Sequence, residues 1–403
     1  MSPELLPVDE ALARLLAPAQ PVAGTERVPT LGADGRVLAR DVCSTLDVPS
    51  ADNTSMDGYA VRVADLAAGR RLPVSQRIPA GRVGEPLAAG TVARIFTGAL
   101  VPAGADAVVM QEQAEPGGDH VVFRHVPQPG EWIRRAGEDI RAGGVVLPAG
   151  TTLTPQALGL AASVGAAELE VRRRVRVACF FTGDELRMPG EPLPSGAIYN
   201  SNRFVLTALL TRLGCEVLDL GIVPDTLDAT RAALREAAAR TDLIVTSGGV
   251  SVGEEDHVRP AVQAEGAIDL WQIAVKPGKP LAYGHVRRVE GASHFLGLPG
   301  NPVSSFVTFV LFVRPFVQRL QGAAARAPRS YPMRADFDRP RPDRRREFLR
   351  VRINARGGLD AFPNQGSGVL TSTVWGDGLA DVSAGRTFRA GELVPFLPFD
   401  ELV

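Results

Sequence analysis

The stretch VRVACFFTGDEL, residues 175–186, is the best indicator of this chain's fold class. Its first seven residues are an apolar run typical of a strand buried on both faces of a sheet. Similar runs follow at residues 216–220, 243–246, 270–275 and 295–298. Stretches suited to helices lie at residues 203–213, 227–239, 258–264 and 302–320. Because strands alternate with helices, we predict an α/β domain at residues 175–326 with a mainly parallel sheet covered on both faces.

The segments on either side of the α/β domain have a different pattern. Residues 49–145 are rich in Gly and Pro and contain short apolar runs between turn signals, which predicts a small all-β domain. Helical periodicity is present at residues 8–17 and again at 155–164, where Thr154 is suited to cap a helix that begins at Pro155. Beyond Gly322, an Ala-, Arg- and Pro-rich stretch leads to β-like runs that predict a second small β domain.

The composition excludes several classes of protein. With 403 residues the chain is long enough for two to four domains, and its formal net charge of -1 argues against bulk binding to nucleic acid or to a membrane surface. Its three cysteines are too scattered for a disulfide scaffold or a zinc knuckle, and Cys179 and Cys215 are expected to be buried free thiols. The N-terminus does not resemble a signal peptide, and Arg314 ends the most apolar run, so we expect a cytoplasmic protein.

Lysine usage points to an anionic ligand. Of 44 basic residues only two are Lys, namely Lys276 and Lys279, and both lie in VKPGKP at residues 275–280. The Lys ammonium is a compact point charge that fits where the planar guanidinium group of Arg does not. Chance could place two lysines together, but their position in one turn motif favours a role in binding a phosphate-bearing anion.

Three loops of the α/β domain carry unusual polar residues, and ligands of such sheets bind beyond the carboxyl ends of the strands. TGDEL, residues 182–186, suits a divalent cation or a ribose, although acids at a helix start would look the same. TSGGVSVGEED, residues 246–256, could bring backbone N–H groups to a phosphate, and Asp256 could bind a metal or cap a helix. This loop matches neither GxGxxG nor a Walker A motif, which weakens nicotinamide and P-loop interpretations.

The third loop is LPGNPVSS, residues 298–305. Asn301 is expected to cap the last helix of the domain with its side chain, Pro302 to begin that helix, and Ser304 to lie in its first turn. We also expect an anion site there. In the β domain, DNTSMDGYA at residues 52–60 and GEDI at 137–140 are acidic, but turn chemistry alone would explain both.

Six motifs occur in one order along the chain: NTSMDGYA, GEDI, TGDEL, SGGVSVG, KPGKP and LPGNP. Together they resemble the MoeA family of molybdopterin molybdenumtransferases, which is related to the C-terminal domain of gephyrin. Each motif alone is weak evidence, but six in order are highly specific. The resemblance extends from about residue 8 to residue 400.

The resemblance implies a transferase that inserts molybdate into adenylylated molybdopterin, releases AMP and forms molybdenum cofactor. It implies an elongated homodimer whose active cleft lies between the α/β domain of one subunit and the β domain of the other. The four domains would comprise residues 1–48 with 146–174 as a discontinuous α+β linking domain, 49–145, 175–326, and 327–403 as a β-barrel-like module.

The family's functional residues can be carried over motif by motif. The catalytic residues would be Asp57, Thr97 and Asp139 from the partner subunit, with Glu185, Asp225, Asp256, Lys276 and Lys279 from the α/β domain. Glu185, Asp225 and Asp256 would also hold Mg²⁺. Further contacts to the molybdopterin substrate and molybdate would come from Gly248, Gly249, Ser251, Gly253, Pro299, Gly300, Asn301, Ser304, Ser367 and either Arg345 or Arg346 of RRREF.

Two alternatives remain open at this point. An ATP-dependent molybdopterin adenylyltransferase shares the α/β domain type but should not need the flanking β domains, and such an enzyme is the expected upstream partner. A non-catalytic scaffold similar to gephyrin is the other alternative. The carboxylates and lysines favour catalysis, and we expect neither nucleic acid nor a membrane as a partner.

Overall fold

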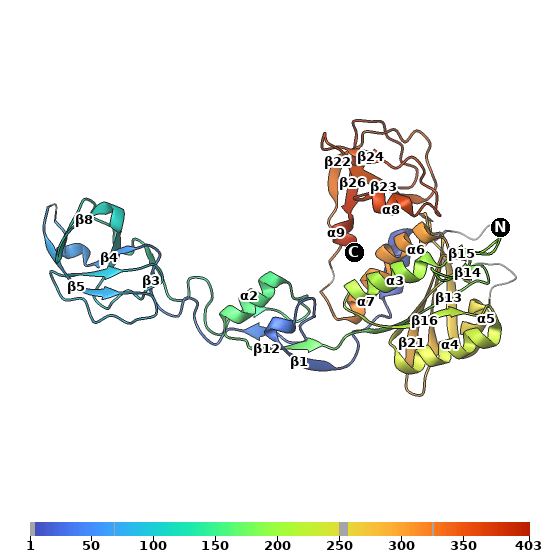
Figure 1. The fold of residues 1–403 in the computed structure, drawn as a ribbon, viewed down its shortest axis with the longest axis horizontal. Coiled ribbons are helices and arrows are strands. Elements are labelled where there is room, and N and C mark those ends of the chain that lie inside the picture. Colours follow the sequence, from blue (N-terminus) through green and yellow to red (C-terminus); the bar gives the residue numbers. More distant parts are fainter. Residues whose placement is uncertain (1–4, 68, 250–256, 325) are drawn as a thin grey trace.

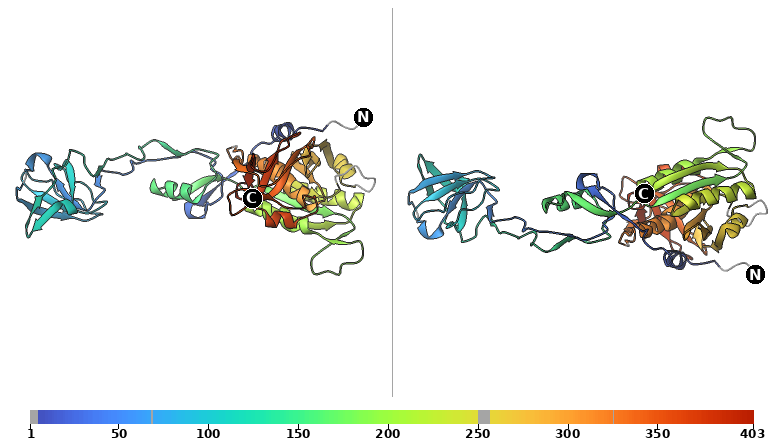
Figure 2. Two further views of the ribbon diagram at one scale, coloured as in Figure 1. Left: turned by 90° about the horizontal axis from the view of Figure 1, so that it is seen from above. Right: turned by 90° about the horizontal axis from the view of Figure 1, so that it is seen from below.

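The computed structural model describes residues 5–67, 69–249, 257–324 and 326–403. The molecule is elongated, and its parts follow one another along the long axis (Figure 1). The β domain lies at one end, a small linking domain lies in the middle, and the α/β domain lies at the other end beside the C-terminal domain. The two views from above and below show the same order (Figure 2).

The α/β domain contains a six-stranded sheet in the order β16-β13-β17-β21-β20-β18. Its first four strands are mutually parallel. Strand β20 pairs antiparallel with both β21 and the edge strand β18, so β18 runs in the same direction as the first four. The bounds are β13 Arg176–Thr182, β16 Glu216–Val223, β17 Leu243–Ser247, β18 Gly266–Gln272, β20 Pro280–Arg287 and β21 Ala292–Leu298. The prediction of an α/β domain with a mainly parallel sheet is confirmed, but strand β20 was not expected from the sequence.

Helices cover both faces of this sheet. They are α3 Ser201–Arg212, α4 Leu227–Arg240, α5 Val258–Glu265, α6 Pro302–Thr308, the π-helical turn η4 Phe309–Val313, and α7 Arg314–Leu320. Side chains alternate along β13, so Cys179 and Phe181 pack with α3, α6 and α7 while Ala178 and Phe180 pack with α4 and α5. The expected burial of the free thiols of Cys179 and Cys215 is confirmed.

One helical stretch among the described residues, Pro302–Leu320, is long and apolar enough to cross a membrane by length and composition. Inside the fold, however, 72% of its most apolar window is buried. The stretch is therefore the central core helix of the α/β domain.

The β domain holds a six-stranded sheet in the order β7-β4-β6-β5-β9-β8. The bounds here are β3 Asn53–Thr54, β4 Gly58–Val61, β5 Leu72–Ile78, β6 Val92–Ile95, β7 Ala107–Met110, β8 Ala114–Gly117, β9 His120–Phe123 and β10 Ile133–Arg134, with 3-10 turns η2 Val63–Asp65 and η3 Gln111–Gln113. Strand β10 pairs with β3 outside that sheet.

The linking domain is built from two distant parts of the chain. Strand β1 Thr25–Pro29 pairs with β12 Glu168–Arg172, and β2 Val42–Cys43 pairs with β11 Val145–Leu147. The 3-10 turn η1 Thr30–Gly32 and helix α2 Pro155–Ser163 complete it, and the side chain of Thr154 caps α2 as predicted. Helix α1 Val8–Leu16 packs instead into the core of the α/β domain, because its apolar face meets α7.

The C-terminal domain has a sheet in the order β19-β23-β25-β26-β22, with β24 beside β23. The bounds are β19 Val275–Lys276, β22 Tyr331–Arg334, β23 Arg346–Ile353, β24 Leu359–Ala361, β25 Gly378–Val382 and β26 Leu393–Pro398, with helices α8 Thr371–Trp375 and α9 Phe399–Leu402. Strand β19 comes from the lysine motif of the α/β domain, so the two domains share a sheet.

In the α/β domain, a small parallel pair of strands, β14 Leu186–Arg187 with β15 Ile198–Tyr199, follows β13.

Candidate active site

A cavity of about 690 Å³ lies where the carboxyl ends of β13, β17 and β21 meet the C-terminal domain. It is lined by Thr182, Gly183, Glu185, Asp225, Gly248, Gly249, Lys276, Pro277, Gly278, Lys279, Pro280, Pro299, Gly300, Asn301, Ser304, Arg345, Gln365, Gly366 and Ser367. One cavity therefore collects residues from five sequence motifs that lie far apart in the chain: TGDEL, SGG, KPGKP, LPGNPVS and NQGSG.

Strand register explains why three of these loops converge. Ser247 is the last residue of β17, and its Cα partners are Phe181 on β13 and Leu298 on β21, so the three strands end at one level. Gly248 then adopts φ +96, and a Cβ there would lie 2.8 Å from the backbone oxygen of Thr182. Only glycine lets the loop after β17 turn this closely against the end of β13.

The loop at residues 299–301 is held by a side chain that the sequence had not marked as a site residue. The Nδ2 of Asn202, on α3, donates to the Oγ of Ser247 at 2.8 Å and to the backbone oxygen of Gly300 at 2.7 Å. The Oγ of Ser247 donates in turn to the oxygen of Pro299 at 2.9 Å. Asparagine is rare in this chain, with three of its six copies in the site motifs, and that usage could have pointed to Asn202.

The expectation that the side chain of Asn301 caps helix α6 is wrong. Asn301 occupies the N-cap position and Pro302 the first helical position, but the Asn301 side chain makes no capping hydrogen bond. The physical reason is that the C-terminal domain supplies an acceptor: the backbone oxygen of Ser367 accepts from the N–H of Val303 at 2.9 Å. Asn301 instead lines the cavity, as does the buried Ser304.

The lysine motif forms one wall of the cavity. Gly278 adopts φ +111, and a Cβ there would lie 2.5 Å from the Oγ1 of Thr308, so the loop packs directly on α6. The Nζ of Lys276 forms ion pairs with Glu347 at 2.8 Å and with Asp343 at 3.0 Å. Hydrogen bonding to Glu347, chiefly, raises the pKa of Lys276. Lys279 is exposed and makes no ion pair with any residue in the described ranges.

The C-terminal domain continues this wall through Arg345, Gln365, Gly366 and Ser367, because β19 of the lysine motif pairs with β23. The Nε of Arg345 donates to the Oδ1 of Asp343 at 3.1 Å, and the guanidinium group holds the pKa of Asp343 well below its usual range. Arg346 does not line the cavity. It pairs with Asp381 at 2.6 Å and with Asp9 at 2.9 Å, because adjacent side chains at the start of β23 point in opposite directions. The two-residue alternative thus reduces to Arg345.

Arg350 is a second residue that sequence reasoning missed. Arg350 is 1% exposed, and it forms no ion pair with any carboxylate among the described residues. Its guanidinium donates to the oxygens of Gly366 and Phe348 and to the Oγ of Ser372 at 3.0–3.3 Å. Burial lowers its pKa to about 10. Its backbone N–H and oxygen also fix the side chain of Gln365.

Two predicted acidic residues, Glu185 and Asp225, line the cavity. Asp256, Ser251 and Gly253 lie outside the described residues. Within the described part of the chain, no group of three or more His, Cys, Asp or Glu side chains is arranged to hold a metal ion. The described residues therefore offer two carboxylates in the cavity that Lys279 also lines.

The remaining predicted residues lie elsewhere in the molecule. Asp57, between β3 and β4, accepts from the Oγ1 of Thr97 at 2.6 Å and from its N–H at 2.8 Å, and these bonds lower the pKa of Asp57. Asp139 is exposed between β10 and β11. Strands β3 and β4 lie at the end of the molecule opposite the α/β domain (Figure 1), so one chain does not bring Asp57 and Thr97 to the cavity.

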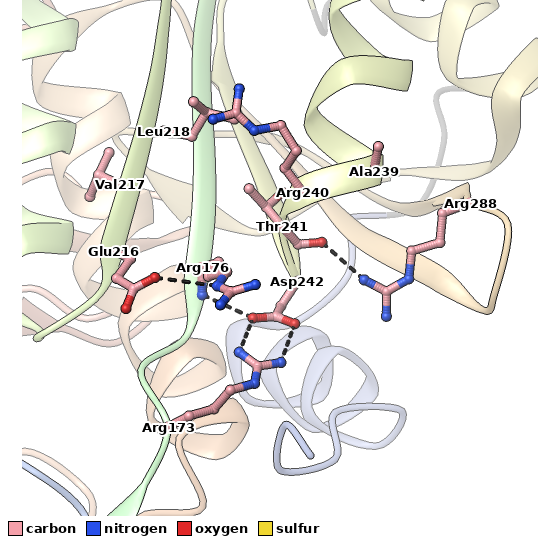
Figure 3. A pocket seen from close by; sticks show the side chains of 10 residues that line it. All are labelled: Arg173, Arg176, Glu216, Val217, Leu218, Ala239, Arg240, Thr241, Asp242 and Arg288. Atoms are coloured by element: carbon pink, nitrogen blue, oxygen red, sulfur yellow. Dashed lines mark hydrogen bonds and ion pairs between the residues drawn. The ribbon is translucent and has the colours of Figure 1, made fainter. Parts of the chain in front are cut away.

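A second hollow, of about 570 Å³, lies at the amino ends of the same parallel strands (Figure 3). Four arginines and two carboxylates line it. Arg173 binds Asp242 through two hydrogen bonds of 2.8 Å, Arg176 pairs with Glu216 at 3.3 Å, and Arg288 donates to the backbone oxygen of Thr241 at 3.3 Å. Because ligands of such sheets bind beyond the carboxyl ends of the strands, this second pocket is a weaker candidate than the first cavity.

Three family models match successive parts of the chain. Residues 6–165 match the MoeA N-terminal region (domain I and II), residues 178–319 match a probable molybdopterin binding domain, and residues 332–399 match the MoeA C-terminal region (domain IV). The molybdopterin molybdenumtransferase of Haemophilus influenzae is 40% identical over 99% of this chain and 100% of its own length. Molybdopterin molybdenumtransferase 2 of Mycobacterium tuberculosis is 40% identical over 82% of this chain and 84% of its own.

A solved structure is similar over nearly the whole length. The molybdopterin biosynthesis moeA protein of Pyrococcus horikoshii OT3 matches with a TM-score of 0.83 and 29% identity, covering 98% of this chain and 100% of its own. All of its domains are therefore represented in this chain in the same order. The chain belongs to the MoeA family of molybdopterin molybdenumtransferases.

Proposed function

We propose that this chain inserts molybdate into adenylylated molybdopterin, releasing AMP and forming molybdenum cofactor. The observation that carries the proposal is the single cavity that collects residues from TGDEL, SGG, KPGKP, LPGNPVS and NQGSG. The relatives that match the whole chain, flanking β domains included, are named molybdopterin molybdenumtransferase. An adenylyltransferase would not need those flanking domains, so that alternative is disfavoured.

The charge of the cavity suits this chemistry. Molybdate is a dianion and adenylylated molybdopterin is also anionic, so bringing them together requires positive charge to offset their repulsion. Lys279 supplies an exposed ammonium group, and Arg345 and Lys276 lie nearby in the same wall. Because strands and a core helix hold these groups in place before the substrates bind, little reorganisation is needed when the substrates meet.

Mg²⁺ is part of the proposal, and the residues present fit it. Mg²⁺ is usually bound by one or two carboxylates together with waters and substrate phosphates, and Glu185 and Asp225 line the same cavity. When bound, the ion would polarise the phosphoanhydride and stabilise the charge on departing AMP. The protein's own residues would hold the two anions side by side and restrict the approach of water.

We further propose that the working unit is a homodimer. Asp57 and Thr97 are prepared as an exposed, hydrogen-bonded carboxylate and hydroxyl, but they lie at the far end of the chain from the cavity. A second copy in the reverse direction would place its β domain over the cavity and complete the site. The adenylylated substrate would come from a molybdopterin adenylyltransferase, and we predict a cytoplasmic location.

The direct test is a reconstituted reaction. Purified protein, Mg²⁺, adenylylated molybdopterin and molybdate should give AMP in an amount that depends on molybdate. Consumption of ATP with adenylylation of molybdopterin would instead identify an adenylyltransferase. Binding of the pterin without turnover, under conditions in which the Haemophilus influenzae relative is active, would support a scaffold.

A further inference from the structure

The junction between the α/β domain and the C-terminal domain runs through the wall of the cavity. Strand β19 pairs in parallel with β23, with Val275 opposite Arg346 and Lys276 opposite Glu347. The N–H of Arg346 also donates to the oxygen of Ala274 at 2.8 Å. The width of the cavity therefore depends on how firmly this junction holds, because Arg345 and the loop at residues 365–367 reach the cavity only from the C-terminal side.

A connected network of ion pairs between acidic and basic side chains crosses this junction. Glu347, with only 4% of its side chain exposed, accepts from Lys276 through Oε1 at 2.8 Å and from the Nε of Arg339 through Oε2 at 2.8 Å. Asp343 accepts from Lys276 at 3.0 Å and from the Nε of Arg345 at 3.1 Å. Asp343 thus orients a cavity-lining arginine and a lysine together. A buried carboxylate such as Glu347 persists only when it is well paired.

The two lysines of the motif differ in their surroundings. Two carboxylates of the C-terminal domain already neutralise the ammonium of Lys276, and 38% of that side chain is exposed. Lys279 lines the cavity and is exposed, and it forms no ion pair with any residue within the described ranges. An incoming oxyanion would have to compete with Glu347 and Asp343 for Lys276, but not for Lys279.

We propose that Glu347 and Asp343 are positioning residues of this site. Their ion pairs with Lys276 give the two lysines different roles. Lys276 fastens the C-terminal domain to the α/β domain and so sets the position of Arg345, whereas Lys279 meets a tetrahedral oxyanion. The inference rests on the proposed function and deepens it. Molybdate and the phosphate of the pterin share this oxyanion chemistry, and the experiment distinguishes between them.

The effect of Glu347→Gln on anion binding distinguishes this proposal from the alternative, in which Lys276 itself binds the oxyanion. If Lys276 bound the oxyanion, Glu347→Gln would remove a competing negative charge and tighten anion binding. If Lys276 fastens the junction, the same substitution weakens the junction and misplaces Arg345. We then expect kcat to fall by roughly tenfold or more while the KM for molybdate stays within about threefold of wild type. A residue that acted only on folding would not produce this split.

The experiment compares full-length Lys276→Gln, Lys279→Gln, Glu347→Gln and Asp343→Asn with the control Arg344→Gln. Arg344 is an exposed member of the same triple-Arg run and does not line the cavity. AMP release is measured with molybdate varied at saturating adenylylated molybdopterin, and then with the pterin varied. Lys279→Gln should raise one of the two KM values by roughly tenfold, which identifies its anion. The other three variants should lower kcat and the melting temperature.

A second measurement keeps the inference independent of turnover. Calorimetry with inorganic molybdate, and separately with inorganic phosphate, should show weaker binding of at least one of these anions to Lys279→Gln and nearly unchanged binding of both to Lys276→Gln and Glu347→Gln. Tighter molybdate binding by Glu347→Gln, or equal loss of binding in both lysine variants with unchanged melting temperatures, would overturn the proposal. A wild-type protein that releases no AMP would refute the proposed function, and the calorimetric and melting results would still decide how the lysines differ.

Discussion

Lys276 and Lys279 lie three positions apart in the sequence, but the fold gives them different environments. Replacing Lys279 with Arg should raise the KM for its oxyanion by roughly tenfold, because a wide guanidinium fork cannot take the place of a compact ammonium in a loop packed on α6. The melting temperature should not change, since the side chain is exposed. Steady-state kinetics measure this, with exposed Arg344→Lys as the reciprocal control. Unchanged kinetics of Lys279→Arg would show that any positive charge at this position is enough to bind the oxyanion.

The pKa of Lys276 leads to a prediction at alkaline pH. Its folded-state pKa is raised, mainly by Glu347, above an unfolded value of about 10.4, so its contribution to stability is present below that value. The contribution is lost as the pH rises through the folded pKa. We expect the stability difference between wild type and Lys276→Gln to shrink as the pH rises above the unfolded value of about 10.4. Denaturant unfolding across this range tests it, and a difference that stays constant would contradict the ion-pair role.

Single residues also show where reasoning from sequence stops. The usage of Lys led directly to a cavity wall, because a rare residue type clustered in one motif. Three nearby arginines, at positions 345, 346 and 350, could not be separated in the same way, since their roles depend on which way each side chain points at or near β23. Arg345 faces the cavity, Arg346 pairs with Asp381, and Arg350 is buried behind Gly366.

The turn after β17 is the structural element on which the cavity depends most directly. Gly248→Ala should destabilise the protein by about 1–3 kcal/mol and reduce activity strongly, because φ is positive and the new Cβ would meet the Thr182 oxygen at 2.8 Å. Gly165→Ala is the matched control, since Gly165 has a similar φ of +82 and nothing within 4 Å of an added Cβ. Thermal unfolding and AMP release measure the two effects. Equal losses in both variants would mean that backbone strain alone, and not the contact with Thr182, matters.

Most elements of the α/β domain could be predicted from periodicity, and the misses have physical causes. Strand β20 was missed because Pro280 and Gly284 interrupt its apolar pattern, and its antiparallel pairing with β18 and β21 is a long-range effect. The cap of α6 was misassigned because its acceptor, Ser367, is distant in sequence. Local patterns predict elements, but they cannot predict which domain supplies a missing hydrogen bond.

The elongated shape of the whole molecule keeps Asp57 away from the cavity of its own chain. The linking domain separates the β domain, which contains Asp57, from the α/β domain along the long axis (Figures 1 and 2). If the working unit is a dimer in reverse orientation, each of its two sites takes its lysines from one chain and Asp57 from the other.

This arrangement predicts complementation between two inactive variants. Assayed with both substrates well below their wild-type KM values, Asp57→Asn and Lys279→Gln should each have little activity as pure dimers. After the two are mixed in equal amounts, unfolded and refolded together, half of the dimers are mixed, and one of the two sites in each mixed dimer has both native residues. The mixture should therefore recover about a quarter of wild-type activity. Size-exclusion chromatography with light scattering confirms the dimer, and wild type refolded in the same way sets the scale. Recovery no greater than the mean of the two pure variants would show that the site is contained within one chain.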